Sequence, residues 1–552
     1  MQNYEQFAEA SFVRIVRAAP ELAGRMGIAG LPELADLNGR LDDRSIAADF
    51  ARRDLLDQIH AEHRRYERAA LDPREQLTFD VFEFFLAYLP FEPWSGVAGR
   101  DFVLHHYPVR HVWGAPAETF NLLANTHRIA SEADERAFIA RLEQLGPMAR
   151  GLVEGLEYRD ARGLSPPRDA LAIVRKELEA VDVTSIAGNR SAALQALAAP
   201  IIEAFFRGPL ADLIACLKRL EATAAEPLGV WRLPRGDEFY RYCLTRETST
   251  PMTPDAIYAL GESEVARLHG ELASDVAALG FDGGDLRKSM AAALKLPAAG
   301  RDTEARRAEI VDYYTRLLDE ARTKIRALFG MFPKAQCVVK PSPRHLEARR
   351  TTTYFPAAAD GSYPGWLELN LAGELDKAPW TRHALAYHEA WPGHHLQLSL
   401  AQEAPHLGLF RRTFVVAAFL EGWAKYAERL PFETGIDREP RYELQRKAME
   451  LVSASNLMLD AGIHDRRWSR GQAVAFSMAN GLVEREMAEY LVDRSSVSPG
   501  QLCAYTIGLS EVRRLRAGMQ RRDGVRFSLA AFHDALLGEG ALPLDVLRKK
   551  FA

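Results

Sequence analysis

The residues best suited to chemistry lie together at 388–395, a stretch that reads His-Glu-Ala-Trp-Pro-Gly-His-His. Hydrolysis by zinc needs neutral imidazole or carboxylate ligands, an open coordination position for water, and a carboxylate that takes a proton from that water. The usual pattern has two histidines four residues apart on one helix, with a glutamate directly after the first as general base. The stretch therefore predicts a metal site with His388 as a ligand and Glu389 as the base.

The second histidine does not stand at the usual distance. Four positions after His388 comes Pro392, and the next imidazoles belong to His394 and His395. On a straight helix His395 would lie about 10 Å further along the axis and His394 would point away. Because Pro392 lacks an N–H and clashes with the preceding turn, we expect a bend or bulge there, which Gly393 makes easier. A bulge that absorbs two residues would favour His394 over His395 as the second ligand.

The third protein ligand is expected from a later helix. Glu421 is a carboxylate within the otherwise apolar stretch 419–424, and a buried carboxylate needs a partner. It follows His394 by 27 residues, which leaves room for one loop and the start of another helix. Two histidines and one glutamate form a known zinc ligand set, so Zn²⁺ is the expected cofactor. Glu428, seven residues after Glu421, is a candidate to support a ligand.

The elements that must position these residues are predicted to be mainly helices. Apolar residues recur at steps of three and four from Phe138 to Leu152, which is the spacing of one helix face. Another helix has both ends marked, by Thr253 as N-cap and Gly280 as the stop. The best strand patterns are 336–340 and 366–370, so we expect a small β-sheet just before the metal site.

Composition excludes several classes of protein. The chain has 552 residues, of which 47% are hydrophobic and 26% charged, and its net charge of −5 is not gathered in blocks of one sign. We therefore expect neither nucleic acid nor a membrane as partner. No leader and no apolar run of roughly 18 residues is visible, which predicts a cytoplasmic protein. We expect one continuous body over 1–552, or a split into lobes 1–230 and 231–552.

The block at 388–395 resembles the hallmark of the bacterial DUF885 proteins, His-Glu-x-x-Pro-Gly-His-His. The likeness covers most of residues 10 to 520, with similar segments at 231–236, 353–356, 421–428, 460–464 and 499–501. It implies a mainly α, multi-helix fold of the gluzincin type, akin to the neurolysin and carboxypeptidase Taq class of metallopeptidases. Such a fold would have a deep cleft beside its zinc site. The resemblance implies this zinc-site architecture rather than a substrate.

Two positions depart from the pattern of that family. Asn456 stands where the family usually has an arginine, eight residues before His464. Ser495 follows Arg494, where the family tends to have a tyrosine. If the family's side chains bind a substrate carboxylate or an oxyanion, this protein prefers a different substrate or has lost peptidase activity.

Further residues are candidates for helping the reaction. Tyr505, in a stretch that resembles a Tyr-x-Ile-Gly segment of the family, is the first candidate to stabilise the negative charge on the carbonyl oxygen. His464 is a candidate acid or hydrogen-bond donor, and Arg494 could clamp a terminal carboxylate, as in a carboxypeptidase. Tyr354 and Asn370 are candidates to bind substrate through backbone pairing. For each, packing in the core or exposure at the surface is the alternative.

Together these patterns predict a zinc-dependent hydrolase that cleaves peptide bonds in a peptide or small amide substrate. We expect zinc to activate a water molecule, while Glu389 takes its proton and passes it to the leaving amine. One alternative is a zinc amidase that acts on a small modified metabolite. Another is a non-catalytic helical binding protein whose metal site is degenerate, as the unusual histidine spacing and Asn456 would suggest.

Overall fold

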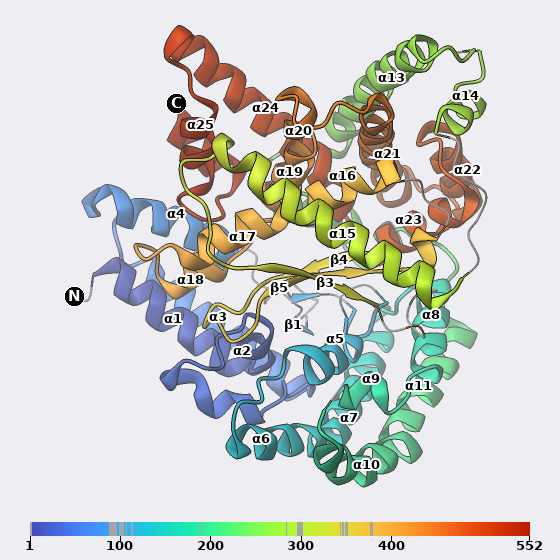
Figure 1. Cartoon of the computed structure of the whole chain (residues 1–552). Helices are drawn as coiled ribbons and strands as arrows, with labels where there is room; N and C mark the ends of the chain where they lie inside the picture. Colours follow the sequence, from blue (N-terminus) through green and yellow to red (C-terminus); the bar gives the residue numbers. More distant parts are fainter. Residues whose placement is uncertain are drawn as a thin grey trace.

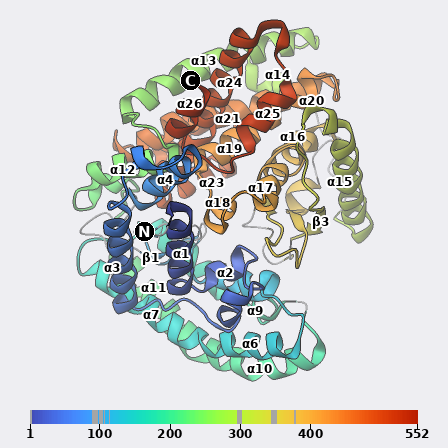
Figure 2. The ribbon, with the colours of Figure 1, turned by 90° about the vertical axis from the view of Figure 1, so that its left-hand side faces the viewer.

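The protein is mainly helical, with a small sheet near its middle (Figure 1). The computed structural model describes residues 3–87, 97–98, 104–105, 107–111, 114–188, 190–282, 284–294, 302–342, 344, 347, 351–375 and 379–552. Most helices before residue 225 lie on one side of the sheet and most helices after residue 379 lie on the other, as two perpendicular views show (Figures 1 and 2).

The first part of the chain is built from helices and one short antiparallel strand pair, β1 (Val97–Ala98) and β2 (Leu104–His105). The helices are α1 (Tyr4–Ala18), α2 (Glu21–Arg25), α3 (Ile46–His63), α4 (Pro73–Ala87), α5 (Ala117–Asn121), α6 (Glu132–Glu143), α7 (Leu145–Asp160), α8 (Arg168–Glu179), α9 (Thr184–Ala187), α10 (Ala192–Arg207) and α11 (Pro209–Thr223).

In the middle of the chain, the described residues form the sheet and four α-helices. The helices are α12 (Gly236–Thr248), α13 (Pro254–Ala278), α14 (Leu286–Ala293) and α15 (Glu304–Ile325), and the strands are β3 (Cys337–Pro341), β4 (Thr353–Phe355) and β5 (Gly365–Leu369). The strand order is β3-β5-β4, with β3 parallel and β4 antiparallel to β5. Both strands expected from the sequence are therefore present. The third strand, β4, is too short to produce a recognisable pattern.

The last part of the chain is helical again and contains His388, His394 and Glu421, the metal ligands expected from the sequence. Its helices are α16 (Pro379–Glu389), α17 (His394–Glu403), α18 (Leu409–Thr413), α19 (Ala417–Ala427), α20 (Leu430–Glu433), α21 (Pro440–His464), α22 (Arg470–Asn480), α23 (Arg485–Val497), α24 (Ala504–Asp523), α25 (Leu529–Leu537) and α26 (Leu544–Phe551).

The capping residues in the sequence predict both ends of α13, but the apolar periodicity misses the break between α6 and α7. The Thr253 hydroxyl accepts a hydrogen bond from the N–H of Ala256 at the start of α13, and Gly280 follows its end with φ of +84°, as predicted. The apolar series from Phe138 to Leu152, in contrast, belongs to two helices, α6 and α7. Pro147, near the start of α7, cannot donate to the carbonyl that a continuous helix would offer it, which explains the break.

One core joins the two ends of the chain. A single cluster of buried apolar side chains includes Phe12 of α1, Phe82 of α4, Trp423 of α19 and Leu547 of α26. A second cluster lies almost entirely among the helices α5 to α11. Within the described ranges, no helix is long and apolar enough to cross a membrane.

Candidate metal centre

The helix that carries His388 stops before it reaches His394. Helix α16 ends at Glu389, α17 begins at His394, and the Trp391–Pro392 peptide bond between them is cis. Gly393 has a φ of −76°, so its backbone is not left-handed. Glycine is needed there because a side chain would not fit. A Cβ atom there would lie 1.8 Å from the carbonyl oxygen of His388. The chain thus brings His394 back toward His388 by ending one helix and starting another, where we expected a bulge within one helix.

Helix α19 holds this turn in place and also carries Glu421. The indole N–H of the buried Trp423 donates to the carbonyl oxygen of Pro392 at 2.9 Å. The side-chain amide of Gln397, on α17, donates to the carbonyl oxygen of Phe419 at 3.2 Å. Glu421 lies on α19 between these two contacts, so the same helix fixes both the turn and the carboxylate.

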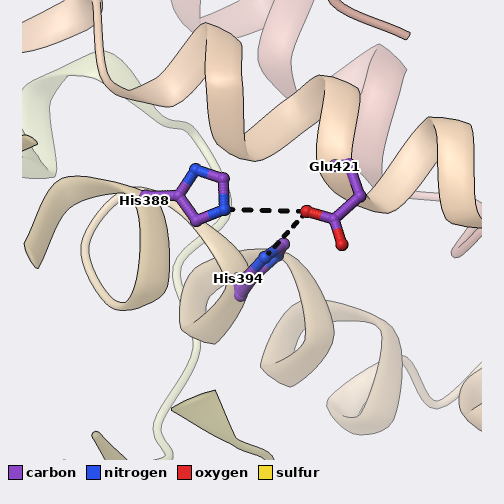
Figure 3. A group of neighbouring side chains, drawn as sticks. All are labelled: His388, His394 and Glu421. Atoms are coloured by element: carbon purple, nitrogen blue, oxygen red, sulfur yellow. Dashed lines mark ion pairs between the residues drawn. The ribbon is translucent and has the colours of Figure 1, made fainter. Parts of the chain in front are cut away.

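His388, His394 and Glu421 converge on one point (Figure 3). The Oε2 atom of Glu421 lies 3.6 Å from Nε2 of His388 and 3.5 Å from Nε2 of His394. These separations are longer than hydrogen bonds. Two ligand atoms on one tetrahedral zinc ion, each about 2.0 Å from the metal, lie about 3.3 Å apart. The three side chains therefore fit a metal ion.

The surroundings of the three residues favour a cation. Glu421 Oε2 is buried and has no hydrogen-bond partner in the part of the chain that the structure describes. Burial alone would lower the pKa of His388, but the carboxylates of Glu421, Glu428 and Glu389 outweigh it and raise that pKa to about 10. Burial would raise the pKa of Glu421, yet the two imidazoles hold it well below its usual range. The negative potential that favours the protonated form of His388 would also favour a bound metal ion.

A carboxylate behind His388 sets the orientation of its ring. Nδ1 of His388 lies 2.8 Å from Oε1 of Glu428, and the ammonium of Lys425 donates to Oε2 of Glu428 at 2.8 Å. Since a carboxylate only accepts, Nδ1 carries a proton, and Nε2, which faces Glu421, is the nitrogen that would bind a metal ion in exchange for its own proton. Lys425 offsets the charge of the fully buried Glu428. Glu428, singled out in the sequence, therefore contacts His388 directly.

Glu389 lies beside the three residues but is not one of them. Its Oε2 atom accepts a hydrogen bond of 3.0 Å from the backbone N–H of Tyr354 in β4. Burial raises the pKa of Glu389, and this effect exceeds the opposing effects of His388, His394 and the Tyr354 bond. A raised pKa suits a group that must accept a proton and then release it.

The candidate site opens into a large cavity. The cavity has a volume of about 1150 Å³ and is lined by residues from both the first and the last parts of the chain. The lining residues include Tyr354, His388, Glu389, His394, Glu421, Arg494, Gln501 and Tyr505. The described side chains thus leave room for a substrate larger than a single amino acid.

Tyr505 and Arg494 are brought together at the wall of this cavity. The Tyr505 ring stacks on the ring of His388, with centroids 6.4 Å apart and an angle of 17° between the planes. Nη2 of Arg494 donates to the Tyr505 hydroxyl at 2.8 Å and to Oε1 of Gln501 at 2.7 Å. Burial is the main reason that the pKa of Tyr505 is raised, so its hydroxyl keeps its proton.

Three of the site residues proposed from the sequence, His395, His464 and Asn370, do not lie among the residues that line the cavity. His395 directs Nδ1 to the Tyr354 hydroxyl at 2.8 Å and Nε2 to the carbonyl oxygen of Ala335 at 3.1 Å, so both its nitrogens are engaged. His464 accepts the N–H of Val230 on Nδ1, and its Nε2 lies 3.0 Å from the carbonyl oxygen of Ser495. Asn370 donates from its side chain to the carbonyl of Glu347. None of the three lines the cavity.

Tyr354 lines the cavity, where its substrate-binding role stays a prediction, and it is already engaged by other residues. Its backbone N–H is already bound to Glu389, and its hydroxyl is bound to His395. Pairing with an extended substrate through that N–H would therefore require the bond to Glu389 to break. Its N–H instead holds the carboxylate of Glu389.

The two departures from the family pattern lie in the core. The Ser495 hydroxyl donates to Oδ2 of Asp460 at 2.9 Å, and both residues are buried. Asn456 is also buried, on α21. Neither Ser495 nor Asn456 lines the cavity.

Sequence reasoning missed Lys425, Trp423 and Gln501. Lys425 stands three residues before Glu428 in an apolar stretch, so the i, i+3 charge pairing was a usable signal. Gln501 belongs to the Pro-Gly-Gln block of the resemblance, in the short 3-10 helix Gln501–Cys503. The contact of Trp423 with the turn depends on how α19 crosses α17, and no local pattern reveals such a crossing.

Comparisons with known proteins support a shared fold and a family. The structure is similar to that of a "putative lipoprotein" from Colwellia psychrerythraea, with a TM-score of 0.93, 23% identity, and coverage of 100% of this chain and 99% of that chain. It is also similar to a "putative lipoprotein of unknown function" from Shewanella oneidensis, with a TM-score of 0.70, 20% identity, and coverage of 100% and 99%.

At these identities the likeness concerns the fold. The search among curated proteins finds no match. A family model described as "Bacterial protein of unknown function (DUF885)" matches residues 20–551. This match spans nearly the whole chain, and the protein therefore belongs to the DUF885 family.

Proposed function

We propose that the protein is a zinc-dependent hydrolase that cleaves an amide bond in a peptide or small amide substrate. The observation that carries this proposal is the convergence of His388, His394 and Glu421, whose ligand atoms all lie within 4.8 Å of one another. Structural zinc sites have four protein ligands, whereas catalytic sites have three and keep one position open. Three ligands beside a cavity match the catalytic pattern.

The neighbours of the three ligands have the properties that amide hydrolysis requires. Bound zinc would supply a Lewis acid that lowers the pKa of water and polarises a carbonyl group. Glu389 takes a proton from the attacking water and gives it to the leaving amine, and the N–H of Tyr354 keeps its carboxylate in place. The Tyr505 hydroxyl accepts from Arg494, so its own proton remains available to the carbonyl oxygen of the substrate.

We also propose that the helices around this cavity form a gluzincin-like metallopeptidase fold with a substrate cleft. The cavity and the Glu421-bearing helix α19 support this view, because the third ligand comes from a helix that follows the histidine pair. A cytoplasmic location, with no nucleic-acid or membrane partner, stays a prediction from the sequence, and fractionation of cells that express the native gene tests it.

The experiment measures metal content and hydrolysis in the same preparations. Elemental mass spectrometry should find about one zinc ion per chain, because the described residues contain one such ligand set. His388→Ala and Glu421→Ala should both lose it. Glu389→Gln should keep zinc while hydrolysis of a peptide library, followed by mass spectrometry, falls by orders of magnitude.

Glu320→Gln, on the exposed side of α15, is the matched control for the loss of one carboxylate and should behave as wild type. If the wild type holds no metal and gains no activity with added zinc, the proposal is wrong and a binding protein becomes the better interpretation. If Glu389→Gln keeps full turnover, Glu389 is not the base. Hydrolysis of small amides but not of library peptides would make the protein an amidase.

A further inference from the structure

Part of the cavity wall beside the candidate metal centre is apolar. Among the described residues that line the cavity are Leu398 of α17, Leu420 of α19, and Phe414 and Val415 in the segment just before α19. All four side chains are only partly buried. Apolar surface exposed within a concave site is a common mark of ligand binding.

Helix geometry places Leu398 close to one of the candidate ligands. Leu398 follows His394 by four residues on α17, so the two side chains lie on the same face of the helix. The Cβ atoms of such a pair are about 5–6 Å apart. Long side chains on a helix lean back toward the preceding turn, which here is the turn that carries His394.

Helix α19 repeats this arrangement around the carboxylate. Leu420 directly precedes Glu421, and Ala417 stands one turn before Glu421 on the same face. Both Leu420 and Ala417 line the cavity. Apolar side chains therefore flank two of the three candidate ligands, His394 and Glu421, on two different helices.

Two aromatic rings extend this apolar wall and are anchored in the core. Phe85 of α4 and Phe414 both line the cavity, and their rings meet edge to face with centroids 5.7 Å apart. The Phe414 ring also stacks on that of Phe410, at 5.2 Å and 27°. Because Phe410 is buried in the main apolar cluster, the two cavity-lining rings are held in place from behind.

We propose that the apolar patch formed by Phe85, Leu398, Phe414, Val415 and Leu420 binds an apolar side chain of the substrate residue that flanks the scissile amide. This inference rests on the proposed hydrolase function. It narrows the substrate class to peptides or amides with a large aliphatic or aromatic residue beside the cleaved bond.

The reach of a substrate residue agrees with this assignment. The Cα atom of a residue that flanks the scissile amide is one or two bonds from the reacting carbonyl carbon, and each bond is about 1.5 Å long. Its side chain therefore begins next to the metal position. Leu398 and Leu420 are the apolar side chains that the two helices place within a turn of His394 and Glu421.

Matched peptides test the proposal on the zinc-loaded full chain. Each is a glycine-rich hexapeptide with one variable residue, which is alanine, leucine, phenylalanine or glutamate. Wild type should cleave beside leucine or phenylalanine with a kcat/KM about 10- to 100-fold above that for alanine, because more apolar surface is buried, and glutamate should do no better than alanine. Product masses show whether the preferred residue lies on the acyl or the amine side.

Variants of Leu398 then link the preference to the patch. Leu398→Ala should lower kcat/KM for the preferred peptide by about 10-fold and leave the alanine peptide nearly unchanged. Leu398→Trp, which fills the patch, should shift the preference toward alanine. Leu420→Ala should act as Leu398→Ala does. Leu400→Ala is the matched control on the same helix and should keep the wild-type preference, because Leu400 packs against the buried core instead.

The outcomes distinguish this inference from the proposed function. Equal loss on all peptides in Leu398→Ala would show that Leu398 only supports His394, and the inference would be overturned while the hydrolase stands. Equal cleavage of the four peptides by wild type would overturn it too.

If no peptide is cleaved, the hydrolase proposal fails and titration calorimetry tests the patch by itself. The probes are N-acetylphenylalanine amide and N-acetylalanine amide. Tighter binding of the phenylalanine compound by wild type, lost in Leu398→Trp and kept in Leu400→Ala, supports an apolar binding site. No difference between the two compounds overturns it.

Discussion

At the scale of single residues, the orientation of His388 depends on a buried carboxylate. Glu428 accepts a hydrogen bond from Nδ1 of His388, and the ammonium of Lys425 donates to its other carboxylate oxygen. Glu428→Gln removes the charge but keeps the approximate shape. Zinc affinity, measured by competition with a chromophoric chelator, should fall about 10- to 100-fold, as for other residues that support a ligand. Glu433→Gln is the control and should bind zinc as wild type does, because Glu433 pairs instead with Arg429 and Arg516.

The Tyr505 hydroxyl gives a second prediction at this scale. Tyr505→Phe keeps the ring that stacks on His388 and removes only the hydroxyl. If that hydroxyl stabilises negative charge on the carbonyl oxygen, kcat should fall about 10²- to 10³-fold while KM changes little. Steady-state kinetics on any substrate found for wild type measures this. A change in KM alone would assign Tyr505 to substrate binding.

At the scale of elements, the site depends on how closely α19 approaches α24. A Cβ atom on Gly508 of α24 would lie 1.9 Å from the carbonyl oxygen of Ala418, and one on Gly422 would lie 2.3 Å from the backbone of Gly508. The two helices therefore meet backbone to backbone. Because Glu421 stands next to Gly422, this approach sets how far the Glu421 carboxylate reaches toward His388 and His394.

Gly508→Ala should disturb both stability and metal binding. The added methyl must push α19 away, which should lower the free energy of unfolding by about 1–3 kcal/mol and weaken zinc binding together. Gly518→Ala lies on the same helix with nothing within 4 Å of its Cβ position, so it should be neutral or more stable by up to about 1 kcal/mol. Urea unfolding and zinc titration of the two variants measure the contrast, and equal effects would contradict the packing argument.

At the scale of the whole molecule, buried neutral histidines should make the fold sensitive to acid. His127, between α5 and α6, accepts from Nη1 of Arg141 at 2.7 Å, and its pKa is lowered to about 3 by burial and by that guanidinium. The pKa of His533 is lowered to about 4, mainly by burial. An unfolded chain takes up protons on both residues below pH 6.5, whereas the folded chain does not.

The free energy of unfolding should therefore fall as the pH drops from about 6.5 to about 4. The sign follows because the folded pKa values lie below the unfolded ones, so protons favour the unfolded chain in this range. His127→Gln should reduce the slope by up to one proton compared with wild type, measured by urea unfolding at several pH values. An unchanged slope would show that His127 is protonated in the folded protein.

Several features of this protein follow from local sequence. Helical periodicity and capping signals are local, so they predict helices such as α13, and alternation with flanking breaks predicts β3 and β5. The grouping of His388 and Glu389 with a helix-breaking Pro-Gly and later histidines likewise lies within a few residues. The carboxylate of Glu421 was recognisable because charge is unfavourable in an apolar stretch.

Only the tertiary structure decides which of these side chains meet. His394 and His395 are neighbours in sequence, yet the end of α16 and the start of α17 direct one toward Glu421 and the other toward Tyr354. His464 has an acidic residue, Asp460, four positions before it, but its two ring nitrogens contact Val230 and Ser495 in the core. Contacts such as Trp423 with Pro392 and Arg494 with Tyr505 join separate elements. Their geometry depends on helix crossings, which are set by packing across the whole core rather than by any local pattern.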